Sequence, residues 1–181
     1  MYGMLTGKEI LRQAELGNIN IGEINPSYAG PNSYDIEIGD TITTYRNIAG
    51  VTPLDMADKD SMETYTYDIP EEGVVIYPGQ LYLVSSRYQV GSNMFIPIIT
   101  GRSSVGRMGI SVHQEAGFGD LGFYGKWTLQ LSTIYPVRIY PFIRMAQIYF
   151  LTVCGERDKL YSGKYQNSLG EAGSKIYLDM K

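Results

Sequence analysis

The chain has 181 residues, of which 44% are hydrophobic, and carries a formal net charge of −4 at pH 7 from 15 Lys plus Arg and 19 Asp plus Glu. This length and composition suit a single globular domain with a core of its own and exclude wholesale disorder. The acidic balance argues against a nucleic-acid partner, because binding a long polyanion needs many basic contacts, whereas a few arginines suffice for a small phosphorylated ligand.

Histidine and cysteine each occur once, as His113 and Cys154. The chain therefore forms no internal disulfide and cannot assemble a Cys/His zinc site. Its first thirty residues lack the basic start and apolar run of a signal peptide, and no apolar stretch of about 18 residues is present to span a membrane. We therefore expect a soluble cytoplasmic protein with no membrane partner and no metal site built from its own side chains.

Residues 5–17 are predicted to form a short helix. Thr6 with Glu9 three positions later fits a capping box, and Gly17 supplies the left-handed residue that ends a helix.

The rest of the chain predicts an all-β fold, a sandwich or a barrel. Short apolar or alternating runs are separated by Gly, Pro, Asn and Asp, and 21 glycines, 8 prolines and 16 tyrosines suit many short strands and tight turns. The predicted strands cover residues 34–38, 81–86, 95–100, 127–133, 137–140 and 146–153.

Two segments are predicted to be peripheral. Residues 55–72 carry seven acidic residues and one lysine, which is typical of a solvated excursion between strands. Residues 161–173 are rich in Gly, Ser, Lys and Tyr without periodicity, so we expect this stretch to be mobile.

The densest polar cluster is residues 101–109, which read GRSSVGRMG. Its two arginines, two hydroxyls and three glycines can present guanidinium, hydroxyl and main-chain N–H donors to phosphate oxygens. The Gly-Lys-Ser/Thr ending of a Walker loop is absent. A plain Gly/Ser turn between exposed arginines is the alternative interpretation.

A second cluster, AGFGDLGFYG at residues 116–125, predicts a hairpin whose backbone closely approaches another group. Asp120 lies in its middle, either as a turn residue that bonds its own backbone or as part of a site. In the strand that follows, alternation places Trp127, Leu129 and Leu131 on one face and Thr128, Gln130 and Ser132 on the other.

These two clusters, with TLQL at residues 128–131, resemble the dCTP deaminase family of the dUTPase-like superfamily, and most resemble its dUMP-forming bifunctional members. Three further signatures fall where that family has them: LTGKEI at 5–10, SYDIEIG at 33–39 and GKYQN at 163–167. The resemblance covers nearly all of residues 1–181 except the acidic segment. It implies one domain with a distorted β jelly roll, also called a β-clip, after the short N-terminal helix.

The resemblance also implies a homotrimer whose active sites are shared between subunits and which binds dCTP or dUTP with Mg²⁺ held through the nucleotide phosphates. By that likeness Arg102, Ser103, Ser104 and Arg107 surround the phosphates, with Ser103 and Arg107 also close to the reacting centre. Asp120 holds the 3′-hydroxyl and positions the attacking water. The pocket is completed by Phe123, Thr128, Gln130, Gln147, Tyr161, Lys164 and Ser168.

The sequence departs from the family at two of these positions. The family's catalytic glutamate is replaced by Gln130, and an amide cannot serve as the general base that zinc-free deamination requires. Ser168 stands where the family usually has a glutamine that closes over the ligand, which predicts weaker closure of the tail. Glu115, just before residues 116–125, is either a substitute base or a loop charge.

Asp120 is retained, and an aspartate is normally ionised at neutral pH, so it can still orient a water for attack on the α-phosphate. The Gln130 amide can pair with uracil or, flipped, with cytosine. The sequence therefore favours an enzyme of pyrimidine deoxynucleotide metabolism that forms dUMP, with hydrolysis of dUTP favoured over deamination of dCTP. The alternatives are a catalytically impaired nucleotide-binding or regulatory homologue and a purely structural jelly-roll protein.

Overall fold

The structure is a computed structural model that describes residues 3–46 and 53–180. It is mostly β, with one regular helix, α1 (Gly7–Glu15), a four-residue helix α2 (Ser103–Gly106), and the 3₁₀ turns η1 (Pro26–Tyr28), η2 (Asp60–Met62) and η3 (Ile176–Asp179). The strands are β1 (Ile19–Asn20), β2 (Tyr34–Glu37), β3 (Thr41–Tyr45), β4 (Thr64–Asp68), β5 (Val74–Ile76), β6 (Tyr82–Ser85), β7 (Val90–Ser92), β8 (Phe95–Gly101), β9 (Ile110–Ser111), β10 (Tyr124–Gly125), β11 (Thr128–Thr133), β12 (Val137–Ile139) and β13 (Arg144–Thr152).

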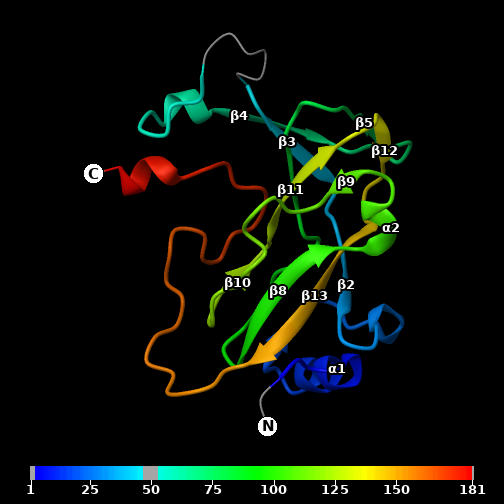
Figure 1. Cartoon of the computed structure of the whole chain (residues 1–181), viewed down its shortest axis with the longest axis vertical. Coiled ribbons are helices and arrows are strands. Elements are labelled where there is room, and N and C mark those ends of the chain that lie inside the picture. The colour runs from blue at the N-terminus through cyan, green and yellow to red at the C-terminus, as the bar shows by residue number, and fades with distance from the viewer. Residues whose placement is uncertain (1–2, 47–52, 181) are drawn as a thin grey trace.

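The strands form small sheets in which every described pairing is antiparallel. The largest has the order β4-β3-β6-β11-β9, and a second has the order β2-β13-β8. Two further sheets have the orders β1-β7-β10 and β12-β5. Figure 1 shows α1 at one end of the molecule, near β2, β8 and β13, and the β5–β12 pair at the other end.

The core lies between these sheets and is built by strand alternation. Leu129 and Leu131 of β11 are 0% exposed, as are Ile148 and Phe150 of β13. At roughly 25 cal/mol per Å² of buried apolar surface, such side chains are the main stabilising contribution to the fold. The same alternation turns the intervening residues of β11 away from the core.

The predicted N-terminal helix is confirmed as α1. The Thr6 hydroxyl accepts a hydrogen bond from the main-chain N–H of Glu9 at 3.3 Å, and Gly17 has a φ of +75°. The capping box is only half formed, because the Glu9 carboxylate accepts instead from Arg12, at 2.8 and 2.6 Å, and from Gln13 at 2.7 Å.

The predicted strands are all confirmed, with ends that differ by one or two residues. Residues 55–72 are mostly exposed, as expected, but the interpretation of the whole segment as an excursion between strands is wrong, because residues 64–68 form β4 and pair with β3. Alternating Thr and Tyr side chains favour a strand at residues 64–68. The prediction overlooked this pattern because it relied on the number of acidic residues in the whole segment.

Residues 116–125 do not form the predicted hairpin. Phe118 bridges to Ile98 of β8, and β10 pairs with β7, so the two arms of the segment pair with other strands. The predicted close approach of the backbone is confirmed, since a Cβ at Gly119 would lie 2.6 Å from the Trp127 ring and one at Gly122 would lie 2.7 Å from Leu160.

Among the described residues, no helix is both long and apolar enough to cross a membrane.

Candidate active site

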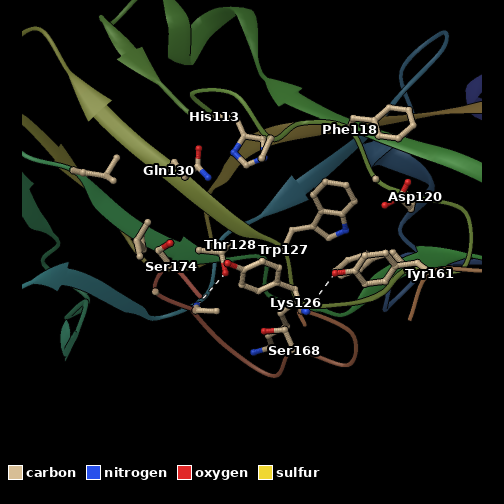
Figure 2. A pocket seen from close by; sticks show the side chains of 18 of the residues that line it. His113, Phe118, Asp120, Lys126, Trp127, Thr128, Gln130, Tyr161, Ser168 and Ser174 are labelled. Atoms are coloured by element: carbon tan, nitrogen blue, oxygen red, sulfur yellow. Dashed lines mark hydrogen bonds between the residues drawn. The ribbon is translucent and has the colours of Figure 1, made fainter. Parts of the chain in front are cut away.

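A cavity of about 400 Å³, here called the central cavity, lies between β11, the segment from His113 to Trp127 and the C-terminal segment (Figure 2). Six of the twelve residues that the resemblance assigns to the site line it: Asp120, Phe123, Thr128, Gln130, Tyr161 and Ser168. The structure therefore brings half of the predicted site together in one chain.

Strand β11 supplies the polar wall of the central cavity. Its exposure alternates, so that Leu129 and Leu131 are fully buried while Thr128 and Gln130 are half-buried and line the cavity. The predicted division of this strand into an apolar and a polar face is confirmed.

Residues 112–114 hold Gln130 in place. The main-chain N–H of Gln130 donates to the carbonyl of Val112 at 3.1 Å, and its side-chain Oε1 accepts from the main-chain N–H of Gln114 at 3.3 Å. Gln114 also donates through Nε2 to the Ser132 hydroxyl at 2.7 Å. The amide oxygen is thus engaged, while the NH₂ group makes no hydrogen bond to any described residue.

Aromatic side chains form a second wall. Phe123 packs edge-on against Trp127, with ring centroids 5.3 Å apart, and against Tyr161, with centroids 5.6 Å apart. Such tilted pairs favour a fixed arrangement of the rings. They provide an apolar surface against which a flat ring or a sugar can pack.

Asp120 lies at the rim, across the cavity from Gln130 (Figure 2). Its main-chain carbonyl accepts from the N–H of Phe123 at 3.1 Å, which closes the turn. Within residues 3–46 and 53–180 its carboxylate has no hydrogen-bond or ion-pair partner, so the turn does not use the side chain. Both carboxylate oxygens therefore remain available as acceptors.

The C-terminal segment closes the remaining side. The carbonyl of Ser168 accepts from the N–H of Lys126 at 2.8 Å, and the N–H of Ala172 donates to the Thr128 hydroxyl at 3.1 Å. Gln166 bonds through its side chain to the N–H of Tyr124 and the carbonyls of Gly122 and Tyr161. In the structure residues 161–173 are packed against the fold through these hydrogen bonds.

A second group of predicted residues lies elsewhere, in an open hollow of about 350 Å³ beside α2. Arg102, Ser103, Ser104 and Gln147 line it, together with Arg144. Asp35 pairs with both arginines, at 3.1 Å from Arg102 and 3.2 Å from Arg144, and thereby holds two guanidinium groups side by side. This hollow is here called the arginine hollow.

The central cavity and the arginine hollow are separate in one chain. Figure 1 shows α2 on one side of the molecule and the C-terminal segment, coloured orange to red, on the other. Arg107 lines neither and is exposed at the end of α2. Lys164 also lines neither, since its ammonium group pairs with the Asp179 carboxylate, a hydrogen bond that raises the pKa of Lys164.

Comparisons with known proteins bear on this arrangement. A model of the dCTP deaminase-like family matches residues 4–153. A protein of Clostridium botulinum (strain Alaska E43 / Type E3) named "dCTP deaminase, dUMP-forming" is 41% identical over 179 residues, which cover 98% of this chain and 99% of that protein. One of Leptospira biflexa with the same name is 39% identical over 98% of each chain.

The chain belongs to the dCTP deaminase-like family. A solved structure supports the same fold: the 2'-deoxycytidine 5'-triphosphate deaminase of Agrobacterium tumefaciens matches with a TM-score of 0.67 at 21% identity. The match covers 84% of this chain and 49% of the other, so the chain spans about half the length of that protein. The predicted dUTPase-like β fold is confirmed.

Within the family, sequence reasoning from motifs missed three neighbours of the site. Asp35 lies in the SYDIEIG signature, but no role was predicted for it, and Arg144 begins β13 three residues before Gln147. The sequence signal for Asp35 was the SYDIEIG segment. That segment forms β2, which pairs with β13 so that Asp35 lies opposite Gln147. The third is His113, which lines the central cavity beside Gln130 (Figure 2).

Glu115, the substitute base considered from the sequence, is exposed and does not line the central cavity. His113 does line that cavity, and both of its ring nitrogens are buried. Burial lowers the pKa of His113, and the main chain of Ala116 opposes that effect more weakly.

Proposed function

We propose that this chain hydrolyses dUTP to dUMP and pyrophosphate, and that it acts on dCTP and dUTP in the metabolism that leads to dUMP, with hydrolysis of dUTP favoured over deamination of dCTP. The carrying observation is that Asp120 and Gln130 line one cavity of about 400 Å³ with an aromatic wall between them. The names of the relatives support a place in the metabolism that leads from dCTP to dUMP.

Asp120 is proposed to act on water and on the sugar. Its carboxylate is free of partners within the described residues, so its oxygens can accept from a 3′-hydroxyl and from a water molecule together. As the water oxygen bonds to the α-phosphorus, the bond to the bridging oxygen breaks and pyrophosphate leaves. The carboxylate orients the water and receives its proton.

Gln130 is proposed to read the pyrimidine edge. Its Oε1 already accepts from Gln114, which leaves its NH₂ group directed to the ligand. An NH₂ donor fits O4 of uracil, an acceptor, better than the amino group of cytosine, which is itself a donor. This orientation of the amide favours dUTP over dCTP.

The phosphates are proposed to meet the arginine hollow of a second copy of the chain. Arg102 and Ser103 line the arginine hollow, whereas Asp120 lines the central cavity, so within one chain the phosphate donors and the base pocket are separate. A homotrimer with shared sites, as the resemblance implies, joins the two groups.

Mg²⁺ is proposed to be bound through the triphosphate. Within the described residues no group of three or more His, Cys, Asp or Glu side chains could hold a metal ion. Mg²⁺ does not require such a group, because it usually keeps several waters and takes its charged ligands from the substrate phosphates. When bound, the ion reduces the negative charge that the attacking water meets.

The test is product analysis. Purified chain is incubated with Mg²⁺ and dUTP or dCTP, and nucleotides and pyrophosphate are separated by chromatography. We expect dUMP and pyrophosphate from dUTP, and their absence contradicts the proposal.

The second candidate is a regulatory module that binds nucleotide without turning it over. The observation that favours it is Gln130 in place of the family's glutamate. Tight binding of dUTP by calorimetry, with the nucleotide unchanged after long incubation, distinguishes it from the hydrolase.

A further inference from the structure

A glutamate of the C-terminal segment is bonded to two strands of the largest sheet. Oε1 of Glu171 accepts from the main-chain N–H of Ser85 in β6 and from the hydroxyl of Thr41 in β3, both at 2.9 Å. Within residues 3–46 and 53–180 no ion pair involves Glu171, so these hydrogen bonds hold its carboxylate. The contact joins the end of the chain to strands that are remote in sequence.

Glu171 fills a gap in the pairing of β3 with β6. These strands pair at Thr43 and Leu83, and the same antiparallel register continued by two residues would bring Thr41 opposite Ser85. The register ends before that pair, and both residues donate to the Glu171 carboxylate instead. Ser85 is 2% exposed, so water is not the acceptor for its N–H. A buried donor is costly to leave unpaired, and this one depends on Glu171.

The residue after Glu171 makes a contact at the central cavity. The N–H of Ala172 donates to the hydroxyl of Thr128 at 3.1 Å. Both residues line the cavity, and Figure 2 shows Thr128 there. Thr128 also lies opposite Ser85 in the pairing of β11 with β6, so consecutive residues of the segment contact paired residues of the sheet. The anchor at Glu171 and the closure of the cavity are therefore coupled through one peptide unit.

No other side chain of residues 168–174 is hydrogen-bonded to a strand among the described residues. The Ser168 hydroxyl donates to the carbonyl of Gly170 at 3.0 Å, which lies within the segment itself. The remaining contacts of this stretch with the rest of the fold run through its main chain. Glu171 is thus the one position in the stretch where a change of side chain alone removes a contact with the sheet.

We propose that Glu171 is a positioning residue of the nucleotide site, whose carboxylate anchors the C-terminal segment to β3 and β6 and so keeps the central cavity closed around a bound nucleotide. Glu171 does not itself line the cavity, so it acts through the segment. This inference rests on the proposed function in that a pyrimidine deoxynucleotide occupies the cavity. It adds a residue to which neither the sequence motifs nor the resemblance gives a role.

Loss of the anchor should affect binding more than turnover. Without the Glu171 carboxylate a smaller fraction of the molecules is closed, and the apparent affinity for a nucleotide falls with that fraction. Saturating nucleotide shifts the population back to the closed form, so kcat should change less than KM. A glutamate with a merely structural role would lower the free energy of unfolding and leave KM unchanged.

The experiment measures kcat and KM for pyrophosphate release from dUTP with Mg²⁺, and the dissociation constant of a nonhydrolysable dUTP analogue by calorimetry. The variants are Glu171→Ala, which removes the acceptor, Glu171→Gln, which keeps an uncharged acceptor, and Thr41→Val, which removes one donor outside the cavity. Thr43→Val is the matched control on the same strand, because its hydroxyl bonds to that of Thr66 at 2.6 Å and not to the segment. Hydrogen exchange at the Ala172 amide follows the anchor without nucleotide.

We expect Glu171→Ala to raise KM and the dissociation constant by about 10-fold or more, since a hydrogen bond to a charged acceptor contributes at least about that factor. Glu171→Gln should raise both by less, because an uncharged acceptor forms weaker bonds. Thr41→Val should also raise both, and adding it to Glu171→Ala should have no further effect, because the two changes remove one contact. Exchange at Ala172 should become faster in each of these variants, whereas Thr43→Val should lower only the free energy of unfolding.

Two results overturn the inference while leaving the proposed function intact. One is a KM for dUTP that is the same in Glu171→Ala and the unaltered chain. The other is a rise in KM with Thr43→Val as large as with Thr41→Val, which would assign the effect to general stability. If Glu171→Ala fails to fold, an unchanged KM in both Glu171→Gln and Thr41→Val overturns it equally.

Failure of the unaltered chain to release pyrophosphate from dUTP contradicts the proposed function instead. Exchange at the Ala172 amide still decides whether Glu171 holds the segment in that case, because this measurement needs no nucleotide. An exchange rate that is the same in Glu171→Ala and the unaltered chain would show that Glu171 is not the anchor.

Discussion

Replacing Gln166 with alanine should detach the C-terminal segment from the central cavity. The Gln166 side chain accepts from the N–H of Tyr124 at 3.0 Å and donates to the carbonyls of Gly122 at 2.8 Å and Tyr161 at 3.3 Å. A net contribution of about 0.5–1.5 kcal/mol for each of the two shorter bonds, those to Tyr124 and Gly122, gives a loss of about 1–3 kcal/mol. That loss corresponds to a roughly 5- to 150-fold larger population with the segment open.

Hydrogen exchange reports this opening directly, because the segment protects amides on both sides of the contact. The N–H of Lys126 donates to Ser168, and the N–H of Ala172 donates to Thr128. Protection at these amides should fall by the factor that the open population gains. Leu169→Ala, at a side chain that is 77% exposed in the same segment, is the control and should leave exchange unchanged. Equal exchange in Gln166→Ala and the unaltered chain would refute the assignment.

Three further outcomes follow from the structure. Leu129→Ala, at a side chain that is 0% exposed, should lower the free energy of unfolding by about 2–5 kcal/mol in urea titrations, whereas Leu16→Ala, at 60% exposure, should change it by under about 0.5 kcal/mol. Because burial lowers the pKa of His113, the unfolded chain binds more protons as the pH falls below 6.5. The free energy of unfolding should therefore fall with pH there, and His113→Gln should remove that component. Asp35→Asn should release Arg102 and Arg144 and weaken calorimetric binding of a nonhydrolysable dUTP analogue.

The fold was predictable where a local pattern determines structure. The cap at Thr6 and the left-handed Gly17 mark α1, and the alternation of Leu129 and Leu131 with polar residues marks β11. β4 was missed because it lies within residues 55–72, whose many acidic side chains predicted a solvent-exposed loop. Its partner, β3, lies outside that segment. Local charge gave no sign of that long-range pairing.

The site was predictable in composition and only partly in arrangement. The resemblance assigned Asp120, Gln130 and Arg102 to one site, but it did not indicate that within one chain Arg102 lies outside the cavity that the other two line. His113 was noticed only as a lone histidine that excludes zinc. Its place beside Gln130 on the central cavity depends on the folded loop around it.

The docking of the C-terminal segment was not predictable for a related reason. Its contacts run through main-chain groups and single side chains such as Gln166, without any hydrophobic period. Periodicity detects elements that bury a face, and this segment is instead held by dispersed hydrogen bonds.

The central claim is that Asp120 of one copy works with Arg102 of another, and complementation tests it most directly. The Asp120→Asn and Arg102→Ala chains are each expressed alone and are also co-expressed at equal levels. Pyrophosphate release from dUTP is measured for all three preparations. Each variant alone should be nearly inactive. Random mixing into the proposed trimers leaves about one half times one half, or about a quarter, of the proposed shared sites intact. Recovery of about that fraction of the unaltered activity is the predicted result, and no recovery above the separate variants would contradict the account.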